Sequence, residues 1–536
     1  MMPLPLSLLA ECTVFVLVGL CLVRIVREYF SPLSSLPNAG VGAPYSRLLW
    51  AFPTEYKGCI TLDLPKLHEK LGPLVRIGPN EVSFYSMEMY DAVHKVNSRF
   101  KKDPRVYGEF VQGGSPALFS ITYDSFQLND RISTDLLSDP VEHSKRRRLM
   151  GQLFNRSQMH KLEGLMLNHI DHFVQTVASS RDGANLLPVC RALEADIMSE
   201  FSFGHTIGAL DAFSQGAELE MIAKNDEKAT WMPLLTSFPG LCNMWEWTEQ
   251  ILSSITGYRN PYNKAMLDFH QWAEKSWRTM LSDNANQEKS TSPFPNLIQT
   301  MVNSNLPSST ALSEATENLG PGTDTTSATL AHILWALGSN PSFQEDLFQD
   351  LAAVSFSTDM TTLEGIPRLR ACVKEGIRWT GAAAAMLPRL VPESGAEFYG
   401  HFLPENTVIS SSPIWYLHDS VAFPRPKEFN PYRWLTSDGQ KIRDDPLRDK
   451  FYIPFSKGAN ICMGAHFAYL ELFLSISQVI RNFRVRVHLL PHHRSYLDEE
   501  KRSSPGVFRH VELPDRREWV AAVPTERLMA ALEPRL

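Results

Sequence analysis

A ten-residue stretch near the C-terminal end, Phe455 to Gly464, constrains this chain more than any other feature. It reads F-S-K-G-A-N-I-C-M-G and precedes a mostly apolar, helix-compatible run from Ala465 to about Phe483. The pattern places Cys462 beside a helix N-terminus, where unpaired backbone N–H groups and the helix dipole stabilise an anion. A cysteine in that position favours its thiolate form and can bind a metal. The flanking glycines allow the backbone to approach closely whatever the sulfur contacts.

The short pattern C-x-G alone would more often mark a buried free thiol in front of a core helix. The whole frame, F-x-x-G-x-x-x-C-x-G, resembles the haem-binding loop of the cytochrome P450 family, in which a Cys thiolate holds the haem iron. The resemblance implies that Cys462 is the axial ligand of haem b, and that Phe455, Gly458 and Gly464 contact the cofactor. At Asn460 the family usually has Arg or His, which pairs with a haem propionate. An amide can still donate a hydrogen bond there but brings no charge.

Composition excludes several other classes of function. The 536 residues carry a formal net charge of −7, and 43% of them are hydrophobic, which is typical of a globular protein with a substantial core. The mild acidity argues against nucleic-acid binding. Seven cysteines without a C-x-x-C pair do not indicate a disulfide framework or a zinc site. The sequence has no G-x-G-x-x-G, P-loop, H-E-x-x-H or G-x-S-x-G motif, so flavin, nucleotide, metalloprotease and serine-hydrolase functions have no support.

The N-terminal region predicts a membrane anchor. Leu4 to Val23 is mostly apolar, no Lys or Arg precedes it, and Arg24 and Arg27 follow it. About 20 residues just suffice to span a bilayer, and positive charge on the C-terminal side predicts a cytosolic body. We predict an anchor over residues 1–30, a proline-rich hinge over 31–50 and a catalytic domain over 51–536. A cleaved signal or a buried core helix remains an alternative. The resemblance to microsomal members implies a single-pass protein of the endoplasmic reticulum membrane with a cytosolic catalytic domain.

The predicted fold is mainly α with small β-sheets, the α+β cytochrome P450 fold. Leu62 to Leu71 has helical spacing, and the alternation from Gly72 to Phe84 predicts a hairpin around Gly78-Pro79-Asn80. Trp231 to Trp247 is rich in large apolar residues, which more often form core. The resemblance implies instead that this region roofs the substrate pocket and dips into the membrane, where Trp suits the interface.

A basic segment, E-H-S-K-R-R-R, places His143 and Arg147 four residues apart and therefore on one helix face. Family members often have Trp or His and then Arg at this spacing, so the resemblance implies that both side chains reach a haem propionate. Such a basic run is usually a solvated helix face. We expect Arg147 to face inward and Lys145, Arg146 and Arg148 to help dock an acidic electron-donor protein.

The second motif, L-G-P-G-T-D-T-T, covers Leu319 to Thr326 inside a long helical pattern. A Thr hydroxyl in mid-helix can bond to the carbonyl one turn back and loosen the backbone ladder, although T-D-T-T alone could also cap a helix. The resemblance implies that Asp324 and Thr325 deliver protons to oxygen at the haem. Pro321 replaces the usual small residue of the family, and we predict a sharper bend there because proline removes a helical hydrogen bond.

The third motif, Glu375-Gly376-Ile377-Arg378, has its two charges three residues apart on one helix face. Alone it is common on solvated helices. The resemblance implies a buried cluster of Glu375, Arg378 and Arg433 with a structural role, since buried charges persist only when paired.

Between these segments, Arg389 matches a position that pairs with a haem propionate. Ala382 to Ala385 match the segment over the haem, where small side chains would leave room for a bulky substrate. Plain helix propensity is the alternative explanation of the alanines. Asp515 to Val523 is expected to return a strand to the pocket.

Together these motifs predict a haem-thiolate monooxygenase. It would activate O2 with electrons from a separate NADPH-dependent cytochrome P450 reductase, with cytochrome b5 as a further candidate donor, because the chain has no flavin motif. The expected product is a hydroxylated or epoxidised lipophilic small molecule, such as a terpenoid or polyketide of filamentous-fungal secondary metabolism. Two alternatives remain open: a haem-thiolate isomerase or dehydratase that does not use O2, and a haem-free, membrane-anchored binding or scaffold protein.

Overall fold

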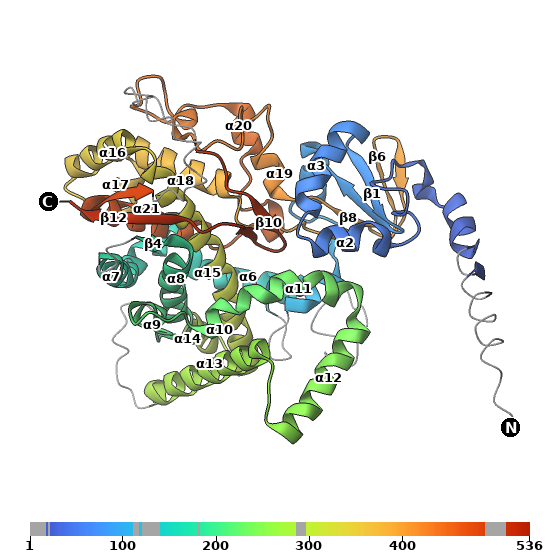
Figure 1. Ribbon diagram of the computed structural model, residues 1–536, viewed down its shortest axis with the longest axis horizontal. Coiled ribbons are helices and arrows are strands. Elements are labelled where there is room, and N and C mark those ends of the chain that lie inside the picture. Colours follow the sequence, from blue (N-terminus) through green and yellow to red (C-terminus); the bar gives the residue numbers. More distant parts are fainter. Residues whose placement is uncertain are drawn as a thin grey trace. The chain divides into compact units, whose positions relative to one another are not determined.

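The computed structural model describes residues 22–110, 117–120, 140–178, 183–285, 296–487 and 511–535, with Phe15, Val18 and Gly19 in addition (Figure 1). These residues form two compact units. The first contains the described residues up to Asp103 together with Met386–Ser412, and the second contains the described residues within Pro104–Ala385 and Pro413–Leu536. Helices predominate over small sheets, which confirms the predicted mainly α architecture with small β-sheets.

The first unit is built on a five-stranded sheet with the strand order β1-β2-β8-β5-β3. Its strands are β1 (Leu74–Gly78), β2 (Glu81–Phe84), β3 (Lys101–Lys102), β5 (Arg389–Leu390) and β8 (Val408–Ser410), and β6 (Ala396–Phe398) and β7 (His401–Leu403) form a separate hairpin. Its helices are η1 (Pro32–Ser35), η2 (Arg47–Leu49), α2 (Ala51–Tyr56), α3 (Ile60–Leu71) and α4 (Met87–Val93), preceded by a helical segment at 22–29. The hairpin predicted from Gly72 to Phe84 is confirmed, because β1 and β2 pair antiparallel with Leu74 opposite Phe84.

The second unit contains most of the helices. They are α5 (Pro104–Tyr107), η3 (Gly108–Phe110), α6 (Pro140–Phe154), η5 (Arg156–Gln158), α7 (Met159–Ala178), α8 (Leu186–Phe203), α9 (Ala209–Ser214), α10 (Glu220–Ala223), α11 (Asn225–Ser237), α12 (Pro239–Thr256), α13 (Pro261–Ala285), α14 (Leu297–Asn303), α15 (Ser308–Gly338), α16 (Pro341–Ala353), α17 (Met360–Glu364), α18 (Pro367–Thr380), α19 (Pro413–Leu417), η6 (Pro431–Trp434), α20 (Pro446–Phe451), η7 (Gly458–Asn460) and α21 (Ala465–Asn482). Its strands are β4 (Ala184–Asn185), β9 (Phe483–Val487), β10 (Arg516–Glu518), β11 (Ala522–Pro524) and β12 (Met529–Pro534). They form two sheets, β4-β12-β9 and β10-β11.

Helix α15 is the centre of the second unit and lies against α8 (Figure 1). Its 31 residues correspond to a length of about 46 Å. The close approach of the two helices depends on Gly322, because a Cβ there would lie 2.5 Å from the terminal methyl of Met198 on α8. From Thr326 onward nearly every residue of α15 is buried, and a continuous apolar core joins it to α7, α8, α18 and α21.

The structure decides between the two interpretations of T-D-T-T. Because α15 begins at Ser308, this motif lies in the middle of the helix and does not cap it. Pro321 is also inside the helix and cannot donate to the carbonyl of Glu317 one turn earlier. The sharper bend at Pro321 stays a prediction.

The predicted anchor, Leu4 to Val23, lies largely outside the described residues. Of the residues that the structure does describe, none belongs to a helix long and apolar enough to cross a bilayer. The division into anchor, hinge and catalytic domain stays a prediction.

Candidate functional site

The loop before α21 is closed by backbone hydrogen bonds. The N–H of Cys462 donates to the carbonyl of Phe455 at 2.9 Å, and the N–H of Ile461 donates to the carbonyl of Gly458 at 3.2 Å. Gly458 has φ +71°, a conformation that favours glycine. Since α21 begins at Ala465, the loop holds Cys462 three residues before the helix, at the position that the sequence pattern predicts.

The thiol of Cys462 is partly accessible, yet it is well surrounded by protein. The surrounding protein desolvates the thiol and raises its pKa, while the Gly464 backbone N–H and the charge of Arg147 act in the opposite direction. The protein environment by itself therefore favours the thiol. A metal ion bound to the sulfur would reverse this preference, because coordination deprotonates a thiol. The accessible face contradicts the alternative that Cys462 is an ordinary buried core cysteine.

Helix α6 places Arg147 against this loop. Its Nη2 donates to the carbonyl of Ile461 at 2.7 Å, one residue before Cys462. His143, one turn earlier on α6, is buried with 3% of its surface exposed. The structure thus brings Arg147 against the loop that holds Cys462, and the expected contact of Arg147 and His143 with a haem propionate stays a prediction.

Arg146 differs from the sequence expectation. We expected it to help dock an electron donor, but it is buried, and its Nη1 lies 3.3 Å from Oε1 of Glu314 on α15. Lys145 and Arg148 are exposed. Arg146 cannot contribute to a docking surface because its side chain points into the interior, where it joins α6 to α15.

Replacing Arg146 with Met should lower the free energy of unfolding by about 3–5 kcal/mol, because Glu314 would lose its buried cation. The matched replacement Arg148→Met removes an exposed cation from the same helix and should cost within about 0.5 kcal/mol. Urea denaturation followed by far-UV circular dichroism measures both. Equal small losses in the two variants would show that the buried pair contributes nothing to stability.

The acid-threonine pair lies on the half-buried face of α15. The hydroxyl of Thr325 donates to the carbonyl of Pro321 at 2.8 Å, the bond to the preceding turn that the sequence suggested. Thr329 repeats this bond one turn later, to the carbonyl of Thr325 at 2.8 Å. Asp324 is half-buried beside them. The helix therefore presents a carboxyl and a hydroxyl at adjacent positions just before its fully buried half.

Three further loop positions are informative. Gly464 has φ −75°, so its backbone conformation does not require glycine. A Cβ there would meet one atom within 4 Å, the Sγ of Cys462 at 3.9 Å, so glycine keeps the space beside the sulfur open. The side-chain amide of Asn460 is half-buried and makes no hydrogen bond within the described part of the chain. The ring of Phe455 packs on the hydrophobic core, and its centroid lies 5.6 Å from that of Tyr469.

The structure brings the three predicted cluster residues together around Glu375, which is fully buried. Arg378 donates from Nε and Nη2 to the two oxygens of this carboxylate, each at 2.9 Å, and Arg433 donates from Nε to Oε1 at 2.9 Å. Burial alone would raise the pKa of Glu375, but the two guanidinium charges outweigh it and hold this pKa below its usual value. The solvated-helix alternative for this motif is therefore wrong.

Two partners of Glu375 were not predicted. The indole N–H of Trp434 and the backbone N–H of Asn430 each donate to its carboxylate at 2.9 Å. Trp434 directly follows Arg433 in the P-Y-R-W segment, and a buried indole needs an acceptor. The position of Trp434 directly after Arg433 was therefore a signal in the sequence for this contact with Glu375.

Arg389 lies in the first unit, in β5, and is 3% exposed. Its Nη1 donates to the carbonyl of Pro388 at 3.0 Å, and its charge adds to burial in lowering the pKa of His94. The alanine segment, in the second unit, is not helical. The N–H groups of Ala384 and Ala385 donate to the carbonyl of Val520 at 3.2 and 3.3 Å, so the helix-propensity explanation is wrong.

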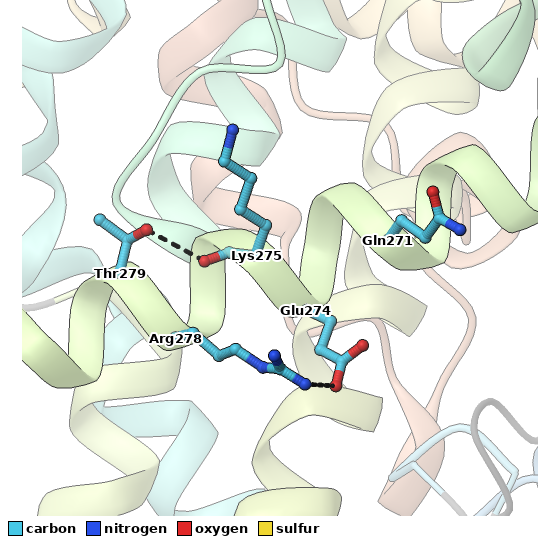
Figure 2. A pocket seen from close by; sticks show the side chains of 5 residues that line it. All are labelled: Gln271, Glu274, Lys275, Arg278 and Thr279. Atoms are coloured by element: carbon cyan, nitrogen blue, oxygen red, sulfur yellow. Dashed lines mark hydrogen bonds and ion pairs between the residues drawn. The ribbon is translucent and has the colours of Figure 1, made fainter.

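A shallow surface pocket, shown in Figure 2, has a different character. Its lining comes entirely from α13 and consists of Gln271, Glu274, Lys275, Arg278 and Thr279. Arg278 and Glu274 form an exposed i,i+4 ion pair at 2.6 Å, which is typical of a solvated helix face. We assign it no chemistry.

Comparison with known proteins gives a consistent result. The family model described as Cytochrome P450 matches residues 44–502. Cytochrome P450 monooxygenase macH of Penicillium terrestre is 26% identical over 507 residues, which cover 90% of this chain and 92% of that protein. Cytochrome P450 monooxygenase sol6 of Alternaria solani is 26% identical over 86% of this chain and 96% of its own. The fusicoccadiene C-8 hydroxylase of Alternaria brassicicola is 24% identical over 90% and 89%, respectively.

Proposed function

Because this chain belongs to the cytochrome P450 family of haem-thiolate monooxygenases, we propose that Cys462 is the residue that ligates the iron of haem b. The observation that carries the proposal is the position of Cys462. It is accessible, it lies just before the N-terminus of α21, and its loop accepts a hydrogen bond from Arg147.

The residues around Cys462 fit a large planar cofactor. Gly464 leaves open the space beside the sulfur, where a side chain would otherwise lie. A glycine surface of this kind suits a porphyrin face, and the thiol supplies the soft donor that haem iron accepts.

We assign the remaining residues by what their groups can do. Arg147 and His143 would hold the propionates, with Asn460 as an uncharged donor in the Cys462 loop, and the role of Arg389, which lies in the first unit, stays a prediction. Phe455, Gly458 and Gly464 shape the loop around the sulfur, and Glu375, Arg378 and Arg433 fix the scaffold behind it. The bound haem would supply the electron transfer to O2, with the thiolate favouring O–O cleavage.

Asp324 and Thr325 would move the protons. The Thr325 hydroxyl donates to the carbonyl of Pro321, so its lone pairs can accept a hydrogen bond from a water and hold that water in place. A carboxyl at the adjacent position can exchange protons with solvent and would pass a proton to this water, which would give up one of its own towards the bound oxygen.

Replacing Thr325 with Val should lower product formation by about 10²-fold while NADPH consumption continues, because the isosteric side chain cannot relay protons. Thr329→Val is the matched control, since its hydroxyl makes the same bond one turn further along, in the buried half of α15. The measurement is product formed per NADPH consumed with a reductase present. An unchanged ratio in Thr325→Val would remove this residue from the proton path.

We propose a lipophilic terpenoid or polyketide intermediate of fungal secondary metabolism as the substrate. One relative is named for hydroxylation of fusicoccadiene at C-8. In this chain, the backbone of Ala382 to Ala385 is hydrogen-bonded to Val520 and Ala522, and the small side chains of this segment would leave room for a bulky ligand.

An exposed apolar surface supports our proposal that the protein associates with the endoplasmic reticulum membrane. Helix α12 has no buried residue. Its large exposed apolar side chains are Leu241, Met244, Trp245, Trp247, Ile251, Leu252 and Ile255. The core interpretation is therefore wrong for this helix, and Trp side chains suit a membrane interface.

We propose electron supply by the membrane-bound NADPH-cytochrome P450 reductase, with cytochrome b5 as a second donor, at a surface that includes the exposed Lys145 and Arg148.

Isotopically labelled O2 tests the monooxygenase function directly. Membranes containing the full chain, a reductase and NADPH are incubated with candidate terpenoids and polyketides, and we expect products that carry one labelled oxygen atom. Conversion without O2 would favour the isomerase or dehydratase alternative.

A further inference from the structure

Two glutamates lie in the apolar core of the second unit, one in the interior of α8 and the other in the interior of α21. Glu194 is 0% exposed and Glu471 is 1% exposed. Their chain neighbours Leu193, Leu470 and Leu472 are buried in the same core. Isolated carboxylates are almost never found in such surroundings, because their desolvation costs several kcal/mol.

No hydrogen-bond donor of the described residues reaches the four carboxyl oxygens, and each carboxyl faces the other. This arrangement differs from that of Glu375, which is equally buried but receives two guanidinium groups. Since the described residues supply no donor, a proton on one of the two carboxyl groups would give the pair a hydrogen bond. Burial, reinforced by the facing carboxyl, raises the pKa of Glu194 well above its usual value, and burial raises that of Glu471 to about 7.

The other ionisable groups that act on the pair do not change its expected protonation. On α7, His169 favours the ionised form of Glu471, but its Nε2 is already 2.5 Å from Oε2 of Glu200. On α8, the buried thiol of Cys190 acts on Glu194 in the same direction as burial. No Lys or Arg of the described residues is among these groups.

We propose that Glu194 and Glu471 hold a proton between them at neutral pH and that this carboxyl pair positions α21, and with it Cys462. The positioning part rests on the proposed function of Cys462, whereas the protonated pair does not. A hydrogen bond between two buried carboxyl groups forms at one axial register of the two helices, while an apolar contact tolerates small shifts. Glu471 lies about 9 Å along the axis from Ala465, and Cys462 precedes that residue by three positions.

Infrared spectroscopy of the full-length wild-type protein tests the proton directly. We expect the C=O stretch of a protonated carboxyl at pH 7, with the small shift in D2O that exchange of its proton produces. The band should be absent from Glu194→Gln/Glu471→Gln and present in Glu345→Gln, a control that removes an exposed carboxylate paired with Arg535. Absence of the band from the wild type, or its persistence in the double variant, would overturn the proposal. This test requires only that the variants fold and does not depend on their activity.

The pH dependence of unfolding gives a second test. Because the folded pKa of the pair lies above the unfolded value, the folded state binds more protons, and stability falls as pH rises from about 5 towards 7 and beyond. The unfolding temperature of the wild type and of Glu345→Gln should therefore decline more steeply over pH 5 to about 8 than that of the double Gln variant. Parallel profiles would contradict a buried proton.

The reduced, CO-bound spectrum tests the link to Cys462. We expect the thiolate-type Soret band of the wild type to disappear on raising the pH at least about one unit earlier than that of the double variant. Identical midpoints would show that the pair does not position Cys462. A wild type without any thiolate-type band would refute the proposed function, and the infrared and unfolding measurements would still decide on the protonated pair.

Discussion

Replacing Cys462 with alanine will abolish the red-shifted Soret band of the reduced, CO-bound protein and reduce monooxygenase activity to the background. Alanine has no lone pair to offer the iron, and a haem without a thiolate ligand loses both the spectral signature and the electron donation that favours O–O cleavage. The loop should persist, because the bond that closes it runs from the backbone N–H of residue 462 to the carbonyl of Phe455. We therefore expect the free energy of unfolding to change by no more than about 1 kcal/mol.

The control is Cys242→Ala, which removes a half-buried thiol from α12 and should leave the band intact. The measurement is the difference spectrum of membranes that contain equal amounts of each protein. Persistence of the band in Cys462→Ala would contradict our assignment of the ligand. A well-folded wild type without haem would favour the scaffold alternative.

Replacing Arg378 with Met should lower the free energy of unfolding by about 3–5 kcal/mol. The guanidinium is fully buried and satisfies both oxygens of Glu375. It also donates to the backbone carbonyls of Leu417 and Pro426, at 3.0 and 2.8 Å. Its loss would leave these acceptors buried without their donor, and Arg433 cannot serve all of them.

Arg425→Met is the matched control. This arginine is 62% exposed and forms an i,i+3 pair with Glu428 at 3.1 Å, so its replacement should cost less than about 1 kcal/mol. Urea denaturation at pH 7 compares the two variants, and haem content reports whether the loop scaffold survives. A loss below about 1 kcal/mol for Arg378→Met would show that the cluster can be dispensed with.

The Glu375 cluster should also affect how the free energy of unfolding depends on pH under acidic conditions. The folded pKa of Glu375 lies below its unfolded value, so its contribution is present above the unfolded pKa and is lost as pH falls below it. This direction is opposite to that of the Glu194 and Glu471 pair, whose contribution declines as pH rises.

The sequence by itself determined the features that depend on neighbouring residues. The position of Cys462 before α21 follows from two glycines and the apolar run behind them. The β1–β2 hairpin follows from alternation around Pro79-Asn80, and the Thr325 bond to Pro321 follows from helical spacing. Each feature is local, so the residues that cause it can be read together.

Only the tertiary structure decided features that depend on a distant partner. Successive residues of a helix point about 100° apart, so nothing within K-R-R-R shows which arginine meets Glu314, 168 positions away. Alanines suit a helix, yet Ala384 and Ala385 lie outside any helix, and their N–H groups donate to the carbonyl of Val520. Glu194 and Glu471 would each pass for a solvated acid in the sequence. They become a proton-binding pair only because folding removes water from both and leaves each facing the other.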